Sequence, residues 1–319
     1  MAITVHPVTS TFVAEVCDVD LSKPLPAEDL AAIKSAFWKY AVLIFPGQEL
    51  TQQQHLDFGR QFGRVESGRI VDNTQQKSRF GNEFSDVSNL DAEGRIWEAD
   101  SRQREYKAAN RLWHTDSSFR FTPGMCSLLY ARSIPPVGGQ TEFTDERAAY
   151  DALDAATRAR LAELIGEHCL ATSRRLGGFS RFTDEEYQRA ERVPQLLVRT
   201  VPESGRKTLY LAAHVGGIYD MPEKESAGLL QQLMAHATQR QFVHSHRWRE
   251  KDLVMWDNRC TMHRGMEYDD LRWARDMRRV TIADAGNSCE LAGVKLPARY
   301  LAAVAAAVVG KTTAPTAEY

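Results

Sequence analysis

The segment Trp113-His114-Thr115-Asp116-Ser117-Ser118-Phe119 places a histidine and a carboxylate two residues apart. On a β-strand, side chains at i and i+2 project from the same face, so a strand here lets His114 and Asp116 reach one metal ion. His263 follows a strand and turn signal at residues 253–258 and offers a second imidazole. Two histidines and one carboxylate form the facial triad of non-haem Fe(II) oxygenases, which leaves coordination positions open. The pattern therefore predicts an iron site made by His114, Asp116 and His263.

The His-x-Asp pair is a weak motif by itself, because it also occurs by chance. A histidine near a strand end is more often structural or solvated than a ligand. His244 and His246 have the same spacing but no carboxylate beside them, which favours a half-buried strand face. The metal interpretation of residues 113–119 needs support from the rest of the chain.

Outward from this segment, short strand-like runs recur and are separated by turn residues such as Pro135-Pro136 and Asp257-Asn258. Helical periodicity covers residues 27–40, 52–62, 146–166 and 222–238. Many short strands with inserted helices predict a mainly β protein of the α+β kind, with a sandwich or jelly-roll core. The predicted strands are 11–18, 41–45, 126–133, 140–144, 195–200, 208–213, 241–248, 253–256 and 278–283.

Two segments do not fit this core. Residues 64–110 are polar and weakly periodic, which indicates a functional loop or lid over a site, with disorder as the alternative. From Asn287 the chain becomes Ala-rich. We therefore expect one domain over residues 1–285 and a C-terminal appendage over 286–319.

The composition of the 319-residue chain is ordinary for a globular protein, and its net charge of -2 gives no reason to expect nucleic acid as a partner. No N-terminal signal is apparent, and the apolar run 301–309 is far shorter than the roughly 20 residues of a membrane span. The five cysteines include no CxxC pair, which favours reduced thiols. These features predict a cytoplasmic protein that does not enter membranes.

Arg275 and Arg279 lie four residues apart, a spacing that puts them on one face of either a strand or a helix. Arginine forks bind carboxylates through two parallel hydrogen bonds, so the pair could hold two acids in a dry pocket. The alternative is a surface cluster paired with Asp269, Asp270 and Asp276. Thr141 follows a glycine turn and offers a hydroxyl donor, although threonine is common in strands in any case.

Taken together, six ordered segments resemble the taurine/2,4-dichlorophenoxyacetate dioxygenase family of Fe(II)- and 2-oxoglutarate-dependent enzymes, nearest to its phenoxyacetate-degrading branch. They read VLIFPGQ (42–48), WHTDSSF (113–119), PVGGQTEF (136–143), AAYDAL (148–153), HATQR (236–240) and VMWDNR (254–259), followed by His263-Arg264. The resemblance extends over about residues 1–285. It implies a double-stranded β-helix and a homo-oligomer.

The resemblance also implies roles for individual residues. His114, Asp116 and His263 would bind Fe(II), and Thr141 with Arg275 would hold the distal carboxylate of 2-oxoglutarate, the cosubstrate used with O2. An acidic aromatic substrate of small size would be held by Arg279, with the remaining pocket residues being His214, Ser117, Trp113 and Arg95. Hydroxylation next to the ether oxygen of a phenoxyacetate would give a phenol and glyoxylate, together with succinate and CO2.

The chain departs from the phenoxyacetate branch in two places, and both affect the substrate. Val215-Gly216-Gly217 replaces a second histidine shortly after His214, and Ile70-Val71-Asp72 lacks the early-loop lysine for which Arg95 substitutes. A taurine-type sulfonate substrate is therefore one alternative. A metal-binding jelly-roll sensor without turnover is another, although a sensor has no need for Thr141 and Arg275 beside the metal.

Overall fold

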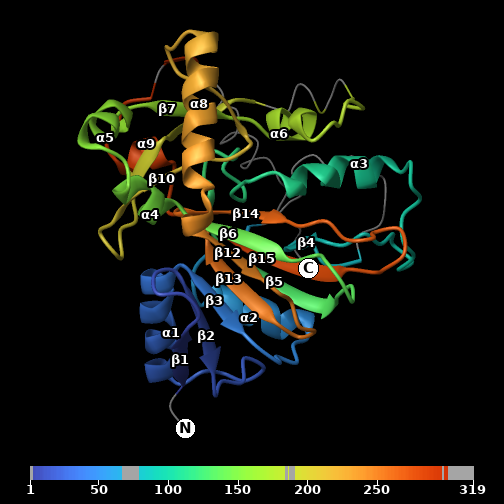
Figure 1. Cartoon of the computed structure of the whole chain (residues 1–319). Coiled ribbons are helices and arrows are strands. Elements are labelled where there is room, and N and C mark those ends of the chain that lie inside the picture. The colour runs from blue at the N-terminus through green and yellow to red at the C-terminus, as the bar shows by residue number, and fades with distance from the viewer. Residues whose placement is uncertain (1–2, 67–78, 184–185, 187–190, 297, 301–319) are drawn as a thin grey trace, which may run out of the picture.

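The computed structural model describes residues 3–66, 79–183, 186, 191–296 and 298–300 (Figure 1). Residues 67–78 of the predicted lid and residues 301–319 of the predicted appendage lie outside this description. No helix in the described part of the chain is long and apolar enough to cross a membrane.

The largest sheet has seven strands, and its central strands are buried on both faces. Alternate residues of one strand enter different clusters: Val42 and Ile44 lie on one side, Leu43 and Phe45 on the other. A strand covered on both faces reads as a continuous apolar run, which is why residues 42–45 are VLIF. The strand order is β1 (Thr4–Pro7), β2 (Val13–Cys17), β3 (Val42–Phe45), β13 (Leu253–Asp257), β5 (Gly124–Ser133), β15 (Asp276–Ala283) and β4 (Phe84–Asp86).

Two helices cover one face of this sheet. Helix α1 (Ala27–Tyr40) buries Ile33, Phe37 and Tyr40, which recur at helical spacing, and it ends at Ala41 in the left-handed conformation. Helix α2 (Gln52–Arg60) begins with a capping box between Thr51 and Gln54. Both helices agree with the predictions from periodicity.

The opposite face packs against a three-stranded sheet of β12 (Val243–His246), β6 (Thr141–Asp145) and β14 (Thr261–Gly265). Phe143 of β6 and Trp256 of β13 meet between the two sheets, with ring centroids 5.5 Å apart. Figure 1 shows the two sheets as stacked layers. The predicted β-sandwich core is therefore confirmed.

A third group of elements lies beyond the small sheet, around the long helix α8 (Figure 1). It includes a sheet in the order β11, β7, β8 and the pair β9 and β10. The bounds are β7 (Ile165–His168), β8 (Val193–Leu196), β9 (Val198–Thr200), β10 (Lys207–Leu209), β11 (Val215–Ile218), α4 (Glu146–Asp151), α5 (Ala155–Leu161), α6 (Leu170–Leu176) and α8 (Glu223–Ala237).

The predicted helix over residues 146–166 is wrong as a single element. The chain instead forms α4, α5 and β7. Asp154 interrupts the helix because its side chain accepts a hydrogen bond from Thr157 N at 2.8 Å and so caps a new helix. Apolar residues alone did not distinguish one long helix from two short ones followed by a strand.

The predicted lid and appendage both contain ordered structure where they are described. Within 64–110, β4 pairs with β15, and α3 (Arg102–Ala108) continues into a 3-10 turn at Ala109–Arg111. After residue 286, helix α9 (Ser288–Leu291) packs beside β8, and Cys289 and Leu296 are buried there. The domain boundary near residue 285 stays a prediction.

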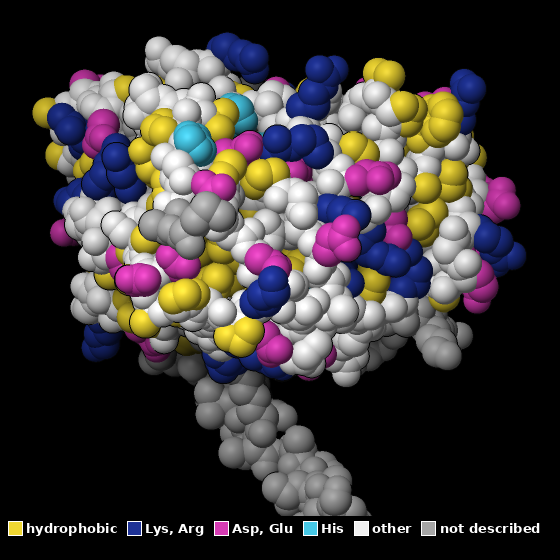
Figure 2. Space-filling view, turned by 90° about the horizontal axis from the view of Figure 1, so that it is seen from below, with side chains coloured by type: hydrophobic (Ala, Val, Ile, Leu, Met, Phe, Trp, Pro, Cys, Tyr) yellow, Lys and Arg dark blue, Asp and Glu magenta, His cyan; other side chains and the backbone are white. Residues whose placement is uncertain are grey.

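The face of the molecule that lies farthest from helix α8, seen from below in Figure 2, carries acidic and basic side chains that alternate over the surface. Hydrophobic side chains occur there in small groups between the charges. This mixture agrees with the small net charge of -2.

Candidate metal centre and its cavity

His114 and His263 are brought together by backbone pairing. Each backbone N–H donates to the carbonyl of the other residue, at 3.0 Å from His114 and 2.7 Å from His263. Their rings lie 4.2 Å apart between centroids. The strand geometry considered for His114 and Asp116 does not extend beyond this bridge, because Asp116 lies in a turn that continues through Ser117, where φ is 58°.

The turn nevertheless brings Asp116 to the two histidines. One ligand atom of each residue lies within 4.8 Å of the others, and all three side chains are buried. His263 Nε2 and Asp116 Oδ2 are 3.7 Å apart. The predicted trio is thus one compact cluster in the structure, with the composition of a 2-His-1-carboxylate centre.

The protonation of these groups suits a cation. Nδ1 of His114 lies 2.7 Å from the carbonyl oxygen of Leu112, which can only accept, so Nδ1 carries the proton and Nε2 keeps its lone pair. Burial lowers the pKa of His114, and it lowers the pKa of His263 well below the usual value, so both rings are neutral. Nδ1 of His263 has no hydrogen-bond partner among the described residues.

Asp116 is held as a carboxylate. Burial alone would raise its pKa, but the guanidinium of Arg279 and the hydrogen bond from Ser127 hold the pKa of Asp116 below the usual range. Arg279 Nη1 contacts Oδ1, and the Ser127 hydroxyl donates to Oδ2 at 2.7 Å. Two neutral imidazoles and one carboxylate, all buried, are the donor set that a divalent transition metal requires.

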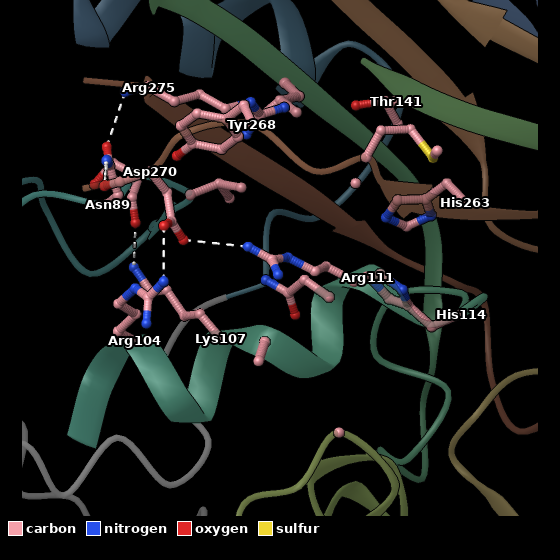
Figure 3. A pocket seen from close by; sticks show the side chains of 18 of the residues that line it. Asn89, Arg104, Lys107, Arg111, His114, Thr141, His263, Tyr268, Asp270 and Arg275 are labelled. Atoms are coloured by element: carbon pink, nitrogen blue, oxygen red, sulfur yellow. Dashed lines mark hydrogen bonds and ion pairs between the residues drawn. The ribbon is translucent and has the colours of Figure 1, made fainter. Parts of the chain in front are cut away.

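A cavity of about 290 Å³ opens next to this cluster (Figure 3). His114 and His263 line one side of it, and Thr141, Arg275 and Arg279 also contribute to its wall. The two arginines share a face as their spacing predicts. The alternative of a surface cluster is wrong, because Asp276 pairs with Arg79 and Arg132, and Asp270 pairs with Arg104 and Arg111.

Arg275 is a buried cation. Its side chain forms no ion pair with any carboxylate of the described residues, and burial lowers its pKa to about 10, so it remains protonated at neutral pH. Thr141 Oγ1 accepts a hydrogen bond from Trp248 Nε1 at 3.0 Å, which leaves the single Thr141 proton for a different acceptor. Arg275 and Thr141 together therefore present unused donors to an acidic group in the cavity.

Besides Asp116, four other predicted residues are not among the side chains that line the cavity. His214 lies beside His114, with ring centroids 6.0 Å apart. Ser117 donates to Glu66 at 2.8 Å, and Trp113 packs under the guanidinium of Arg264. Arg95 is exposed and pairs with Asp91, so the structure does not bring it to the cavity.

The outer wall of the cavity contains residues that the sequence did not single out. Arg104, Lys107 and Arg111 project from α3 and the turn after it, and Arg104 and Arg111 both bind Asp270 (Figure 3). Asn89 fixes the facing loop, since its side chain donates to the carbonyls of Asp270 and Trp273 and accepts from Arg275 N. A signal existed, because cations at 104, 107 and 111 recur at helical spacing after the cap residue Ser101.

A buried 2-His-1-carboxylate cluster between the sheets of a β-sandwich, next to a cavity with unpaired donors, defines the class of non-haem metal oxygenases. The family model described as "Taurine catabolism dioxygenase TauD, TfdA family" matches residues 4–281. The chain belongs to this family.

Known relatives are similar to this protein over most of its length. An alpha-ketoglutarate-dependent 2,4-dichlorophenoxyacetate dioxygenase of Cupriavidus pinatubonensis is 41% identical over 285 residues, 89% of this chain and 99% of the relative. An (S)-phenoxypropionate/alpha-ketoglutarate-dioxygenase of Sphingobium herbicidovorans is 34% identical over 276 residues, 84% of this chain and 91% of the relative. The crystal structure of AAD-2 with Mn(II) and N-oxalylglycine has a TM-score of 0.83 at 44% identity, covering 90% of this chain and 99% of that one. The predicted family and its double-stranded β-helix fold are confirmed.

Proposed function

We propose that this chain is an Fe(II)- and 2-oxoglutarate-dependent dioxygenase that hydroxylates the carbon next to the ether oxygen of a phenoxyacetate-type acid. The observation that carries the proposal is that one cavity lies beside the His114, Asp116 and His263 cluster and is also lined by the buried Arg275 and the partly buried Arg279. The relatives named for 2,4-dichlorophenoxyacetate and phenoxypropionate support the substrate class.

His114, Asp116 and His263 would hold Fe(II) through one nitrogen or oxygen each. When bound there with 2-oxoglutarate, Fe(II) supplies the activation of O2 that oxidises the substrate as 2-oxoglutarate becomes succinate and CO2. Arg275 and Thr141 would bind the distal carboxylate of 2-oxoglutarate. Arg275 suits this task because it is a protonated cation with no described carboxylate partner, so it enters the complex without breaking an ion pair.

Arg279 would hold the acidic group of the primary substrate. Its Nη1 contacts Asp116, while its Nε is buried and has no hydrogen-bond partner among the described residues. A substrate carboxylate at Arg279 lies close to the metal ligands, which places the adjacent CH2 near the reacting centre. Hydroxylation there gives a hemiacetal that breaks down to a phenol and glyoxylate.

The rest of the cavity fits an aromatic tail. Leu129, Trp97, Trp256 and Met266 supply apolar wall between the charged groups. We infer that α3 and the neighbouring residues of 79–110 act as the lid, because they form the outer wall and exclude water from the reaction. The ion pairs that this segment forms with Asp270 do not prevent it from opening, because such pairs can break and re-form in water.

Two further assignments extend the predictions from sequence. We infer a cytoplasmic location, in keeping with five cysteines that are all free thiols. We infer one domain that includes the described residues of 1–285. Assembly into a homo-oligomer stays a prediction.

Succinate release tests the proposed function. The Fe(II)-loaded protein is incubated with 2-oxoglutarate and O2, and succinate is measured with phenoxyacetate, phenoxypropionate, taurine or no added substrate. We expect phenoxyacetates to stimulate succinate release and to yield a phenol in equal amount. Stimulation by taurine alone would favour the sulfonate alternative, and metal binding without succinate release from any acid would favour the sensor.

A further inference from the structure

The turn that carries Asp116 is not held by a neighbouring strand. In its place, the backbone N–H of Asp116 donates to the side-chain oxygen of Asn258 at 3.2 Å. The hydroxyl of Thr115 donates to the backbone carbonyl of Asn258 at 2.6 Å. Thr115 and Asn258 are fully buried, and Asn258 immediately follows β13 in the large sheet. Asn258 therefore fixes the turn to the sheet.

The side-chain amide of Asn258 has only one orientation that satisfies its neighbours. The indole N–H of Trp256 and the backbone N–H of Asp116 both point at one end of this amide, at 2.9 and 3.2 Å. Both groups can only donate, so that end must be the oxygen. The amide nitrogen then faces Ser127 Oγ at 3.0 Å.

This orientation dictates where the Ser127 proton goes. An amide nitrogen only donates, so Ser127 Oγ accepts from Asn258 and must give its own proton to another atom. Asp116 Oδ2 lies 2.7 Å away, whereas the hydroxyl of Thr281 lies at 3.4 Å. Each hydrogen bond of this chain therefore has a fixed donor. Trp256 donates to Asn258, Asn258 donates to Ser127, and Ser127 donates to the carboxylate of Asp116.

We propose that Asn258 and Ser127 are positioning residues that set the plane of the Asp116 carboxylate for metal binding. Ser127 occupies one side of Oδ2, and Arg279 contacts Oδ1. Oδ2 also lies 3.7 Å from His263 Nε2, the other imidazole nitrogen of the cluster. This inference rests on the proposed function, because it assumes that the three-residue cluster binds a divalent metal.

The expected effect is a loss of metal affinity in a folded protein. Groups that orient a metal ligand change affinity by about 10- to 100-fold when they are removed. Ser127→Ala deletes only the hydroxyl, so that the Asp116 carboxylate keeps its contact with Arg279 at Oδ1 but loses its hydrogen bond at Oδ2. Thr281→Val is the matched control, because it removes a neighbouring buried hydroxyl from the paired strand and none of the hydrogen bonds to Asp116 involves its side chain.

The experiment titrates each apoprotein with Mn(II) alone and follows the free ion by its electron paramagnetic resonance signal. Thermal unfolding of each apoprotein in a chelator reports the fold separately. We expect Ser127→Ala to raise the Mn(II) Kd about 10- to 100-fold, and Thr281→Val to leave the Kd within about threefold of the parent. An unchanged Kd for Ser127→Ala, or an equal rise for Thr281→Val, would overturn the proposal.

A second variant covers the case in which Ser127→Ala does not fold. Ser127→Cys keeps a side chain of similar shape with a weaker donor, and the Kd should then lie above that of the parent protein; a parent-like Kd would count against the proposal. Failure of the parent itself to bind Mn(II) would instead contradict the proposed function. The two failures are thereby distinguishable.

Discussion

The inner and outer ends of the cavity are held by different kinds of contact. At the inner end, His114, Asp116 and His263 are each less than a tenth exposed and are fixed by backbone pairing and buried hydrogen bonds. At the outer end, Arg104 and Arg111 reach Asp270 with side chains that are 33% and 40% exposed. Buried, hydrogen-bonded groups hold one geometry, whereas partly exposed ion pairs contribute less and re-form more readily. The inner end can therefore keep the chemistry constant while the outer end adapts to the substrate.

Removal of the carboxylate at the inner end of the cavity should have the largest effect on activity. Asp116→Ala should lower Fe(II)-dependent turnover by on the order of a thousand-fold or more, because it deletes a metal ligand and leaves Arg279 without its partner. Succinate release measures the effect, and Asp269→Ala on the surface loop is a control. Full activity of Asp116→Ala would show that the metal is bound elsewhere.

The two cavity arginines divide the inner end into two anion sites. Arg275→Ala should raise the KM for 2-oxoglutarate about 100-fold, because truncating one partner of a buried charge pair costs ~2–5 kcal/mol. Arg279→Ala should raise the KM for the phenoxyacetate far more than the KM for 2-oxoglutarate. Steady-state kinetics, with each compound varied in turn, measures both KM values in both variants. If Arg275→Ala mainly affected the KM for the phenoxyacetate and Arg279→Ala the KM for 2-oxoglutarate, the two roles would be exchanged.

The sheet that supports the inner end depends on groups that burial keeps uncharged, and this gives a pH test. His55 is fully buried between Phe84 and Tyr130, and burial lowers its pKa to about 3 from 6.5. The unfolded chain therefore binds more protons below pH 6.5, and stability falls as the pH decreases. From pH 7 to pH 5 this histidine alone should reduce the free energy of unfolding by about 2 kcal/mol.

The variant His55→Phe should abolish that part of the acid sensitivity. Urea unfolding at pH 7 and pH 5 would measure it, with the exposed-residue variant His6→Gln as the control. If His55→Phe and the parent lose the same stability between these pH values, His55 is not held neutral in the fold.

The smallest effect is expected at the outer end. Arg111→Ala should change the KM for the phenoxyacetate by about fivefold or less, because an exposed ion pair is worth ~0.2–1 kcal/mol. Arg160→Ala, which breaks an exposed pair with Glu225, is the matched control. A loss comparable to that of Arg275→Ala would mean that the outer wall binds the substrate as firmly as the inner end.

Local sequence patterns were sufficient to predict a helix or strand where its own apolar residues show which of its faces are buried. Helix α1 was predictable because Ile33, Phe37 and Tyr40 recur at helical spacing, and β3 was predictable because it is apolar on both faces. The segment after Glu146 was not, since the break between α4 and α5 depends on one capping side chain, Asp154. The 79–110 segment looked irregular because α3 buries none of its residues.

The groups that could bind a metal or an acid were predictable before the fold was known: the His-x-Asp pair, His263, Thr141 and the two arginines. These follow from residue type and short spacing. The orientation of Asp116 was not predictable, because it depends on sheet packing. Its hydrogen-bond partners Ser127 and Asn258 come from β5 and the end of β13, and its ion-pair partner Arg279 comes from β15. The fold also places α3 and Asp270 at the outer wall of the cavity, whereas Arg95 lies away from the cavity and pairs with Asp91. Contacts between residues far apart in the chain arise from sheet packing, and local periodicity carries no record of them.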